Sequence, residues 1–310
     1  DQFNVTSYTV TIVAIVTLEA FAGMWINAFI ASVICMAWIQ KKTLNSNEKI
    51  LLLLGCSRFW FLCISCLHYF FSTLYPNYLY VHPTFQLITS IQTILNDAQL
   101  WVSTCLCVFY CIKIANFRNS FFIYLKVKID RIVPWLLLGS LLFSLVVGII
   151  VYDVTDKALC KNINLTSQGI FWKASIRSDE HFFSLYLING FGFATSFMAV
   201  TFSALLLLFS LWRHKRNMQT NSMKDLSMDA HIKAMKSILS FLVMYSINFV
   251  FLILSLISSF WTQYHVMFFI YVFLYAFAGF HSLVLICTNP KLEKSMLSIL
   301  SCVNCKVCMK

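Results

Sequence analysis

Seven long apolar runs constrain the fold of this chain more than any other feature of its sequence. A run of about 20 apolar residues can cross the ~30 Å hydrocarbon core of a bilayer as a helix. Transmembrane β-strands would instead alternate apolar and polar residues over about ten positions, and backbone groups in lipid must be hydrogen-bonded within their own helix. The runs therefore predict an all-α membrane protein, a bundle of seven transmembrane helices. Their approximate bounds are Tyr8–Ile39, Ile50–Phe71, Phe85–Ile112, Ile132–Val151, Phe182–Trp212, Ser237–Phe260 and Val266–Thr288.

The composition excludes several other classes of protein. Hydrophobic residues form 60% of the 310 residues and charged residues only 11%, whereas a soluble domain carries about 25% charged residues. A soluble core of this size would not hide so many Phe and Leu side chains. The sequence therefore excludes a soluble enzyme, a disordered chain and a nucleic-acid-binding domain.

The uneven distribution of Lys and Arg predicts how the helices cross the membrane. The net charge is +11, and eighteen of the 23 Lys and Arg residues fall on the side of the predicted bundle that holds the C-terminus. Four fall on the other side, and Arg58 lies within the second run. Because loops rich in Lys and Arg stay in the cytoplasm, we expect a plasma-membrane protein with an extracellular N-terminus and a cytoplasmic C-terminus. The same basic rim would attract anionic membrane lipids.

Two glycosylation sequons agree with this orientation. Asn4-Val5-Thr6 and Asn164-Leu165-Thr166 both fall on the expected outer side, where N-linked glycans are added. One sequon alone is a weak signal, whereas two on the same side support each other. We therefore predict glycosylation at Asn4 and Asn164.

A cysteine-containing tail follows the last apolar run. The amphipathic stretch Lys291–Leu300 predicts a short helix, so we expect one membrane domain over residues 1–300 and a short cytoplasmic tail over 301–310. The tail holds three candidates for reversible palmitoylation, Cys302, Cys305 and Cys308. A metal site there would lack a fourth ligand. We therefore predict no metal site and no cofactor.

Arg58 is the most unusual polar residue in the predicted membrane interior. An arginine at the centre of a spanning helix costs about 2.5–3.5 kcal/mol on insertion scales, so its five N–H donors need acceptors. We expect Asn27 of the first run and Ser282 or His281 of the seventh run to supply them. Such a cluster is either a structural polar clamp between helices or a switch whose partners change with conformation. We favour the clamp.

A second polar cluster lies in the third run. Gln92, Asn96 and Gln99 share one face at helical spacing, and Asp97 lies about 100° round from Asn96. Polar side chains of this kind either hold neighbouring helices together or line a water-filled ligand cavity. The residues alone leave both interpretations open.

Five short motifs lie at or near the ends of the predicted helices. They are residues 54–58 (LGCSR), 109–117 (FYCIKIANF), 210–214 (SLWRH), 229–236 (DAHIKAMK) and 281–292 (HSLVLICTNPKL). These motifs resemble signatures of the bitter taste receptors, the type 2 taste receptor family, in which FYxxKIAxF closes helix 3 and HSxxLIxxNxKL closes helix 7. The resemblance covers most of the chain. It implies a seven-helix G-protein-coupled receptor with a short amphipathic eighth helix, which is not an enzyme.

The resemblance favours a ligand cavity beside the third run. Gln92 and Asn96 fall where bitter taste receptors contact agonists, and we group Asp97 with them. Small, largely apolar or amphipathic bitter agonists are expected to enter this pocket from the extracellular side. The resemblance places three more residues on the pocket wall, Asn248, Phe251 and Tyr271.

The inner ends of helices 3, 5 and 6 are expected to bind a heterotrimeric G protein. By family resemblance this is a gustducin-like α subunit with its βγ partner. Because FYxxKIA stands in the place of a DRY triplet, an ionic interaction based on arginine is not available there. The candidate coupling residues are Tyr110, Lys113, His214, Lys233 and Lys236.

Two residues depart from the family pattern. Ser196 and Ala278 stand where the family usually has proline, in helix 5 and helix 7. Because proline kinks a helix, we expect both helices to be straighter here.

Other membrane proteins fit the sequence less well. A vomeronasal or odorant receptor would carry different signatures in helices 3 and 7, and it is the alternative within receptors. A small-molecule transporter, a weaker alternative, would show inverted repeats or broken helices. A membrane-embedded hydrolase would need a nucleophile and base or a metal motif, and neither His68 nor His281 has such a companion.

Overall fold

The computed structural model describes the backbone of residues 2–79, 82–115, 117, 119–163, 180–219, 225–258 and 264–308. It describes their side chains except at residues 2–10, 12, 73–74, 76–77, 158–163, 180–186, 214–215, 217–219, 225–238, 256, 258, 264–269, 271 and 302–308. In this part of the chain every regular element is a helix, which confirms the predicted all-α fold.

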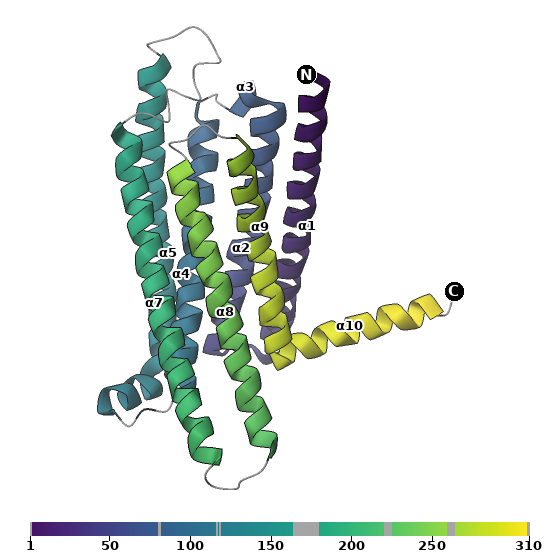
Figure 1. Cartoon of the computed structure of the whole chain (residues 1–310), viewed down its shortest axis with the longest axis vertical. Helices are drawn as coiled ribbons and strands as arrows, with labels where there is room; N and C mark the ends of the chain where they lie inside the picture. The colour runs from purple at the N-terminus through teal and green to yellow at the C-terminus, as the bar shows by residue number, and fades with distance from the viewer. Residues whose placement is uncertain are drawn as a thin grey trace.

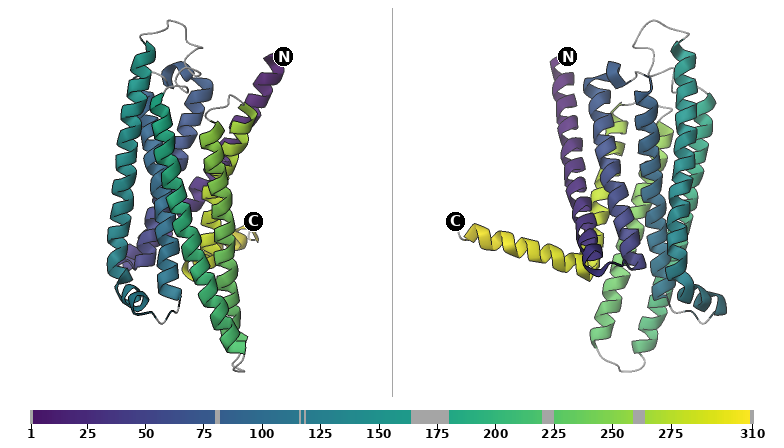
Figure 2. Two further views of the ribbon diagram at one scale, coloured as in Figure 1. Left: turned by 60° about the vertical axis from the view of Figure 1, so that its left-hand side comes forward. Right: turned by 180° about the vertical axis from the view of Figure 1, so that it is seen from behind.

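Long helices run side by side along one axis, and the last helix projects sideways from one end of the bundle (Figure 1). We call this the α10 end; the N-terminus lies at the opposite end (Figure 2). The helices are α1 (Gln2–Lys41), α2 (Ser46–Leu74), α3 (Pro76–Leu79), α4 (Thr84–Ile114), α5 (Ser120–Ile163), α7 (Glu180–Gln219), α8 (Asp225–Ser258), α9 (Tyr264–Thr288) and α10 (Pro290–Cys308).

The predicted spans fall in α1, α2, α4, α5, α7, α8 and α9, one in each, although the last two residues of the sixth span, Ser259 and Phe260, lie outside the described residues. Five stretches of the described chain are long and apolar enough to cross a membrane on their own: Val13–Lys41, Ser46–Ser72, Thr84–Ile114, Ser120–Lys157 and Leu187–Arg213. The described apolar parts of α8 and α9 are shorter, Leu239–Ser255 and Val272–Thr288. The count of seven spans therefore stays a prediction.

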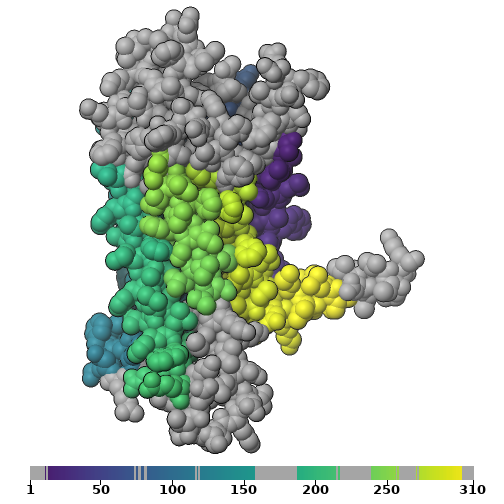
Figure 3. Space-filling view, in the orientation of Figure 1, coloured from purple at the N-terminus to yellow at the C-terminus, as the bar shows by residue number. Residues whose placement is uncertain are grey.

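Six of the long helices pack into a closed ring. Neighbours around the ring are α1 and α2, α2 and α4, α4 and α7, α7 and α8, α8 and α9, and finally α9 and α1. The surfaces of α7, α8 and α9 lie side by side in the space-filling view (Figure 3). Helix α5 packs on the outside of α4. In the most apolar stretch of α4, 67% of the residues are buried, against 33–50% in α1, α2, α5 and α7.

A sharp bend separates α9 from α10. Their axes differ by 97° across Asn289. The side-chain oxygen of Asn289 accepts hydrogen bonds from the backbone N–H groups of Lys291 and Leu292, at 3.1 and 3.4 Å, and Pro290 occupies the first helical position. Asn before Pro is a favourable start for a helix, which explains why a new helix begins here. This helix continues beyond the predicted end at Leu300, to Cys308.

Straighter helices were expected at Ser196 and Ala278, where the family usually has proline. Helix α7 is continuous through Ser196, and α9 is continuous through Ala278.

Two glycines allow α9 to approach α1 closely, because a Cβ added at Gly279 would lie 3.3 Å from the Cα of Gly23. One turn further along each helix, Asn27 of α1 meets Ser282 of α9. The glycine pair therefore sets the helix separation that this polar contact needs.

We expect Gly279→Ala to destabilise the protein. The added methyl group meets backbone rather than a mobile side chain, so α1 and α9 must separate, at a cost of about 1–3 kcal/mol. A lower midpoint of thermal unfolding in detergent is the expected result. Gly139→Ala in α5 is the matched control, because an added Cβ meets nothing within 4 Å there. Equal midpoints for the two variants would contradict the packing role of Gly279.

Candidate functional site

Arg58 of α2 is fully buried where α2, α4 and α9 meet. Its Nη1 donates a hydrogen bond to Ser282 Oγ of α9 at 2.9 Å, and its Nη2 donates to Ser103 Oγ of α4 at 3.1 Å. Nη2 also contacts His281 Nδ1. Because an arginine N–H only donates, His281 Nδ1 accepts, and the proton of the neutral ring lies on Nε2.

Helix α1 joins this network through Asn27. Ser282 Oγ lies 2.7 Å from Asn27 Oδ1 and 2.8 Å from the carbonyl oxygen of Ala278. Asn27 Nδ2 in turn donates to the carbonyl oxygen of Gly23 at 2.8 Å. The structure thus brings together the members of the expected polar clamp, Asn27, Arg58, His281 and Ser282, from α1, α2 and α9. Ser103 adds α4 as a fourth helix.

The positive charge of Arg58 is surrounded by neutral groups. No ion pair in the described part of the chain includes Arg58, and the ring centroid of Phe277 lies 5.8 Å from its guanidinium carbon. Oriented hydroxyl groups and a ring face compensate part of the cost of removing the charge from water. Ser103 was not among the partners expected from the sequence. The feature that could have revealed it is its position one turn after Gln99 in α4. Ser103 Oγ donates a hydrogen bond to the carbonyl oxygen of Gln99 at 2.7 Å.

Gln92, a candidate ligand-binding residue, turns toward α2. His68 Nδ1 lies 2.6 Å from Gln92 Oε1, and Gln92 Nε2 donates to Ser65 Oγ at 3.1 Å. The sequence did not identify either residue as a partner of Gln92, and His68 was considered there only as a possible hydrolase residue. The Gln92 amide is therefore oriented by α2, which limits the directions in which it meets a ligand.

The two neighbouring candidates on α4 have different surroundings. Asn96 is half-buried, and its Oδ1 accepts a hydrogen bond from Gln99 Nε2 at 3.2 Å. Asp97 is buried. Some of the hydrogen-bonding groups on the polar face of α4 thus have partners within the helix itself.

The remaining candidates lie on α8 and α9. Asn248 of α8 is buried, and Phe251 stacks on Phe273 of α9 with ring centroids 4.2 Å apart. Tyr271 belongs to α9, but its side chain lies outside the described residues. Gln92 therefore contacts α2, and Phe251 contacts α9. No contact given for the described residues links Gln92 to Phe251.

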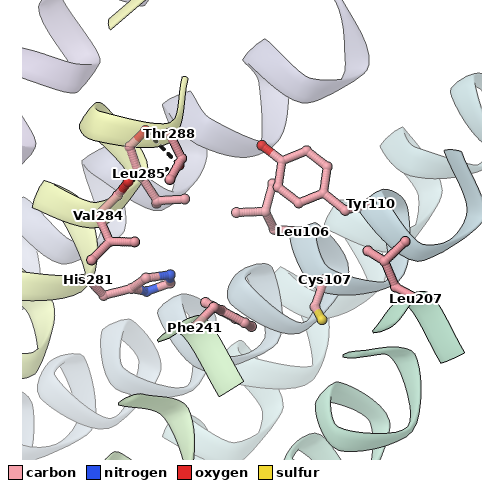
Figure 4. Close-up of a pocket in the computed structure, with 9 residues that line it drawn as sticks. All are labelled: Leu106, Cys107, Tyr110, Leu207, Phe241, His281, Val284, Leu285 and Thr288. Carbon is pink, nitrogen blue, oxygen red and sulfur yellow. Dashed lines mark hydrogen bonds between the residues drawn. The ribbon is translucent and has the colours of Figure 1, made fainter. Parts of the chain in front are cut away.

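A cavity of about 50 Å³ lies toward the α10 end of the bundle, between α4, α7, α8 and α9. The side chains of His281 and Phe241 lie on one side of it, and their ring centroids are 4.7 Å apart (Figure 4). His281 is fully buried, and its Nε2 has no hydrogen-bond partner among the residues that the structure describes. One residue thus belongs to both the Arg58 network and the cavity wall. The lining residues are Leu106, Cys107, Tyr110, Leu207, Phe241, His281, Val284, Leu285 and Thr288.

The candidate coupling residues are placed unevenly around this cavity. Tyr110 lines it, whereas Lys113 Nζ forms an exposed ion pair with Asp130 Oδ2 of α5 at 2.6 Å. His214 lies in α7, and Lys233 and Lys236 lie in α8, but their side chains are outside the described residues.

The candidates for covalent modification are not described at the level of side chains. Asn4 lies in α1, and Cys302, Cys305 and Cys308 lie in α10, but their side chains are outside the described residues. Asn164 is outside the described backbone as well.

The first residues of α2 connect three other helices at the α10 end. Asn47 Oδ1 accepts the hydroxyl proton of Tyr110 at 3.1 Å. Glu48 Oε1 accepts a hydrogen bond from Lys291 Nζ of α10 at 2.5 Å, and Glu48 Oε2 accepts one from the Asn45 backbone N–H at 3.0 Å. Glu48 therefore holds both the start of α2 and the start of α10.

Ser46 extends this connection to α5. Its Oγ lies 3.5 Å from the carbonyl oxygen of Asp130. Pro134 lies inside α5, four residues later, and has no N–H to bond that carbonyl. Ser46 thus supplies a donor to a carbonyl that the helix leaves free. The contacts of Ser46, Asn47 and Glu48 could not be predicted from the sequence, because these residues resemble an ordinary polar loop before an apolar run.

We expect Glu48→Gln to loosen the first turn of α10. Glutamine keeps an acceptor for the Asn45 N–H but removes the charge that pairs with Lys291. A partly exposed ion pair contributes about 0.5 kcal/mol, so backbone amides in that turn should exchange hydrogen about twofold faster. Asp153→Asn is the control, since it removes an exposed pair with Lys157 in α5. Unchanged exchange in Glu48→Gln would show that the pair does not hold α10.

Comparisons with known proteins agree with one another. A family model described as "Taste receptor protein (TAS2R)" matches residues 5–304. The chain is 31% identical over 291 residues to taste receptor type 2 member 7 of Macaca mulatta, covering 91% of this chain and 90% of the relative. It is 31% identical over 290 residues to taste receptor type 2 member 9 of Homo sapiens, with 93% and 92% covered. It is 30% identical over 305 residues to taste receptor type 2 member 64 of Pan paniscus, with 97% and 96% covered.

Proposed function

The chain belongs to the type 2 taste receptor family, which consists of bitter taste receptors related to G-protein-coupled receptors, and from this premise we propose that it detects small bitter agonists and activates a gustducin-type G protein. The observation that carries the coupling part of the proposal is the cavity at the α10 end. Tyr110 of the FYxxKIA motif and His281 of the HSxxLI motif line it together. Two motifs far apart in the sequence thus form one site.

In the proposed orientation, the α10 end faces the cytoplasm of a cell whose plasma membrane holds the receptor. Lys41 ends α1, Lys113 lies in the last turn of α4, and Lys291 lies in the first turn of α10. Such a concentration of positive charge favours the cytoplasmic side and anionic lipids. The N-terminus, with the sequon at Asn4, would then be extracellular together with Asn164, and Cys302, Cys305 and Cys308 would be available for palmitoylation inside the cell.

The proposed agonist pocket lies in the half of the bundle away from α10. Amides and aromatic rings with few charges suit small, largely apolar or amphipathic molecules. An agonist shifts the receptor toward its active arrangement only by binding that arrangement better than the resting one. The pocket residues we propose are Gln92, Asn96, Asp97, Asn248, Phe251 and Tyr271.

The size of the cavity indicates what must change when a G protein binds. A space of about 50 Å³ holds a few water molecules. A helix with its side chains is about 10–12 Å wide, so the helical end of a partner does not fit. We therefore interpret the described arrangement as closed on the cytoplasmic side. Coupling then requires α8 to move away from α4, which would open a site bordered by the candidate coupling residues Tyr110, Lys113, His214, Lys233 and Lys236.

The test is a calcium-release assay in cells that also express a G protein α subunit containing gustducin sequence. We expect at least some compounds from a panel of bitter substances to evoke a concentration-dependent signal that cells without the receptor do not give. If the receptor is present at the cell surface but responds to no compound in a broad panel, this result would contradict the proposed agonist class. A response that persists without the gustducin sequence would contradict the proposed coupling partner.

We expect Asn96→Ala to lower agonist potency about tenfold without lowering surface expression. Loss of one hydrogen bond in a desolvated pocket, about 1.4 kcal/mol, accounts for this change. Concentration–response curves in the same calcium assay measure it. Asn119→Ala, the same change at an exposed position near the α10 end, should leave the curves unaltered. Identical curves for Asn96→Ala and the wild type with several agonists would remove Asn96 from the pocket.

A further inference from the structure

Three hydroxyl groups from three helices meet in the core next to the cavity. Thr104 Oγ1 of α4 lies 2.9 Å from Ser196 Oγ of α7, and Ser196 Oγ lies 2.6 Å from the hydroxyl oxygen of Tyr245 of α8. Tyr245 and Thr104 are 3.4 Å apart. All three side chains are buried, with at most 4% of their surface exposed. We call them the hydroxyl cluster.

The protons of the hydroxyl cluster can be assigned in one consistent order. Thr104 donates to the carbonyl oxygen of Leu100 in its own helix at 3.0 Å. A hydroxyl group has a single proton, so Thr104 must accept from Ser196, and Ser196 must then accept from Tyr245. Each of the three protons has a partner in this order. Ser196 is the central member, because it both donates to α4 and accepts from α8.

The surroundings make these hydrogen bonds sensitive to helix movement. The cluster lies in an apolar core that includes Val200, Leu252 and the ring of Phe277, which meets the ring of Tyr245 edge-on at 6.2 Å. Little water is available there to replace a lost partner. A buried donor that loses its acceptor pays the cost of desolvation without compensation.

The hydroxyl cluster lies one turn away from the cavity wall. Phe241, four residues before Tyr245 in α8, lines the cavity and packs against the Tyr245 ring at 5.7 Å. Cys107, three residues after Thr104 in α4, lines the cavity as well. The hydrogen bonds between α4, α7 and α8 are therefore among the nearest polar contacts to the part of α8 that has to move.

We propose that Thr104, Ser196 and Tyr245 are positioning residues that hold α8 against α4 and α7 in the closed arrangement, so that their hydrogen bonds lower the basal activity of the receptor. The proposal rests on the coupling part of the proposed function. Ser196 stands where the family usually has proline, and a serine there supplies both a backbone N–H and the central hydroxyl. Opening the cytoplasmic side by tilting α8 separates the Tyr245 hydroxyl from Ser196. The cluster thus stabilises the closed arrangement more than the open one, which is the condition for shifting the equilibrium.

Removing the cluster should raise signalling in the absence of agonist. In purified receptor reconstituted with a G protein, we expect Ser196→Ala and Tyr245→Phe each to raise basal nucleotide exchange about fivefold, the effect of one buried hydrogen bond on an equilibrium constant. Because both break the same connection, the double variant should rise little beyond either single variant. Unchanged or lower basal exchange in both single variants would overturn the proposal.

Two controls match these variants in chemistry and place. Thr195→Ala in α7 removes a hydroxyl that bonds only carbonyl oxygens of its own helix, at 2.9 and 3.0 Å, among the contacts described. Ser246→Ala in α8 removes one that bonds the Leu242 carbonyl at 2.8 Å. Both should leave basal exchange unchanged. A rise as large as that of Ser196→Ala would mean that any lost hydroxyl activates, which would overturn the role of the cluster.

A second measurement separates this proposal from the proposed coupling. Spin labels introduced through unnatural amino acids at the exposed positions Ile114 of α4 and Leu239 of α8 report the separation of the two helices without any G protein. Ser196→Ala should increase the population with the longer distance, and Thr195→Ala should not. If the wild type fails to activate a G protein while this shift occurs, the proposed coupling fails and the role of the cluster stands. If the distance distribution stays unchanged, the role of the cluster fails.

Discussion

The fully buried guanidinium group of Arg58 is the constraint on which the rest of the bundle depends. A charge in the apolar interior is tolerated only where acceptors are brought to it, and here they come from α4 and α9, with α1 attached through Ser282. The close approach of Gly23 and Gly279 serves this same contact, because Asn27 and Ser282 lie one turn away. The acceptors are neutral, so the arrangement depends on the geometry of hydroxyl and imidazole groups rather than on a pairing of charges.

The Arg58 network and the hydroxyl cluster divide α4 between two tasks. Through Ser103, α4 joins α1, α2 and α9 into one unit, and through Thr104, the next residue, it contacts α7 and α8. His281 connects the first unit to the cavity, and Phe241 connects the second. This arrangement gives a physical basis for a receptor in which one group of helices stays together while α8 moves. Coupling between the two halves would then pass through the packed rings of His281 and Phe241.

The family and the helical fold could be predicted from sequence because long apolar runs and end motifs are local signals. The partners of Arg58 could be predicted as well, since few polar side chains lie at its depth and a charge in lipid needs them. The partners of Gln92 could not, because its direction depends on the rotation of α4 against α2. The absence of proline at Ser196 indicated a straighter helix, but the contact with Tyr245 is set by packing between helices. Asn47 likewise has no periodic pattern that would reveal its contact with α4.

The central claim is that Arg58 and its neutral acceptors hold the helices together as one cooperative network. A double-mutant cycle between Arg58→Met and Ser282→Ala, read as the free energy of unfolding of purified receptor in mixed micelles, tests it directly. Methionine keeps much of the side-chain volume, so the cycle reports mainly the hydrogen-bonded contact. We predict a coupling energy of about 1–2 kcal/mol between the two positions. Effects that add to within about 0.3 kcal/mol would show that the two residues act independently, and would contradict the network.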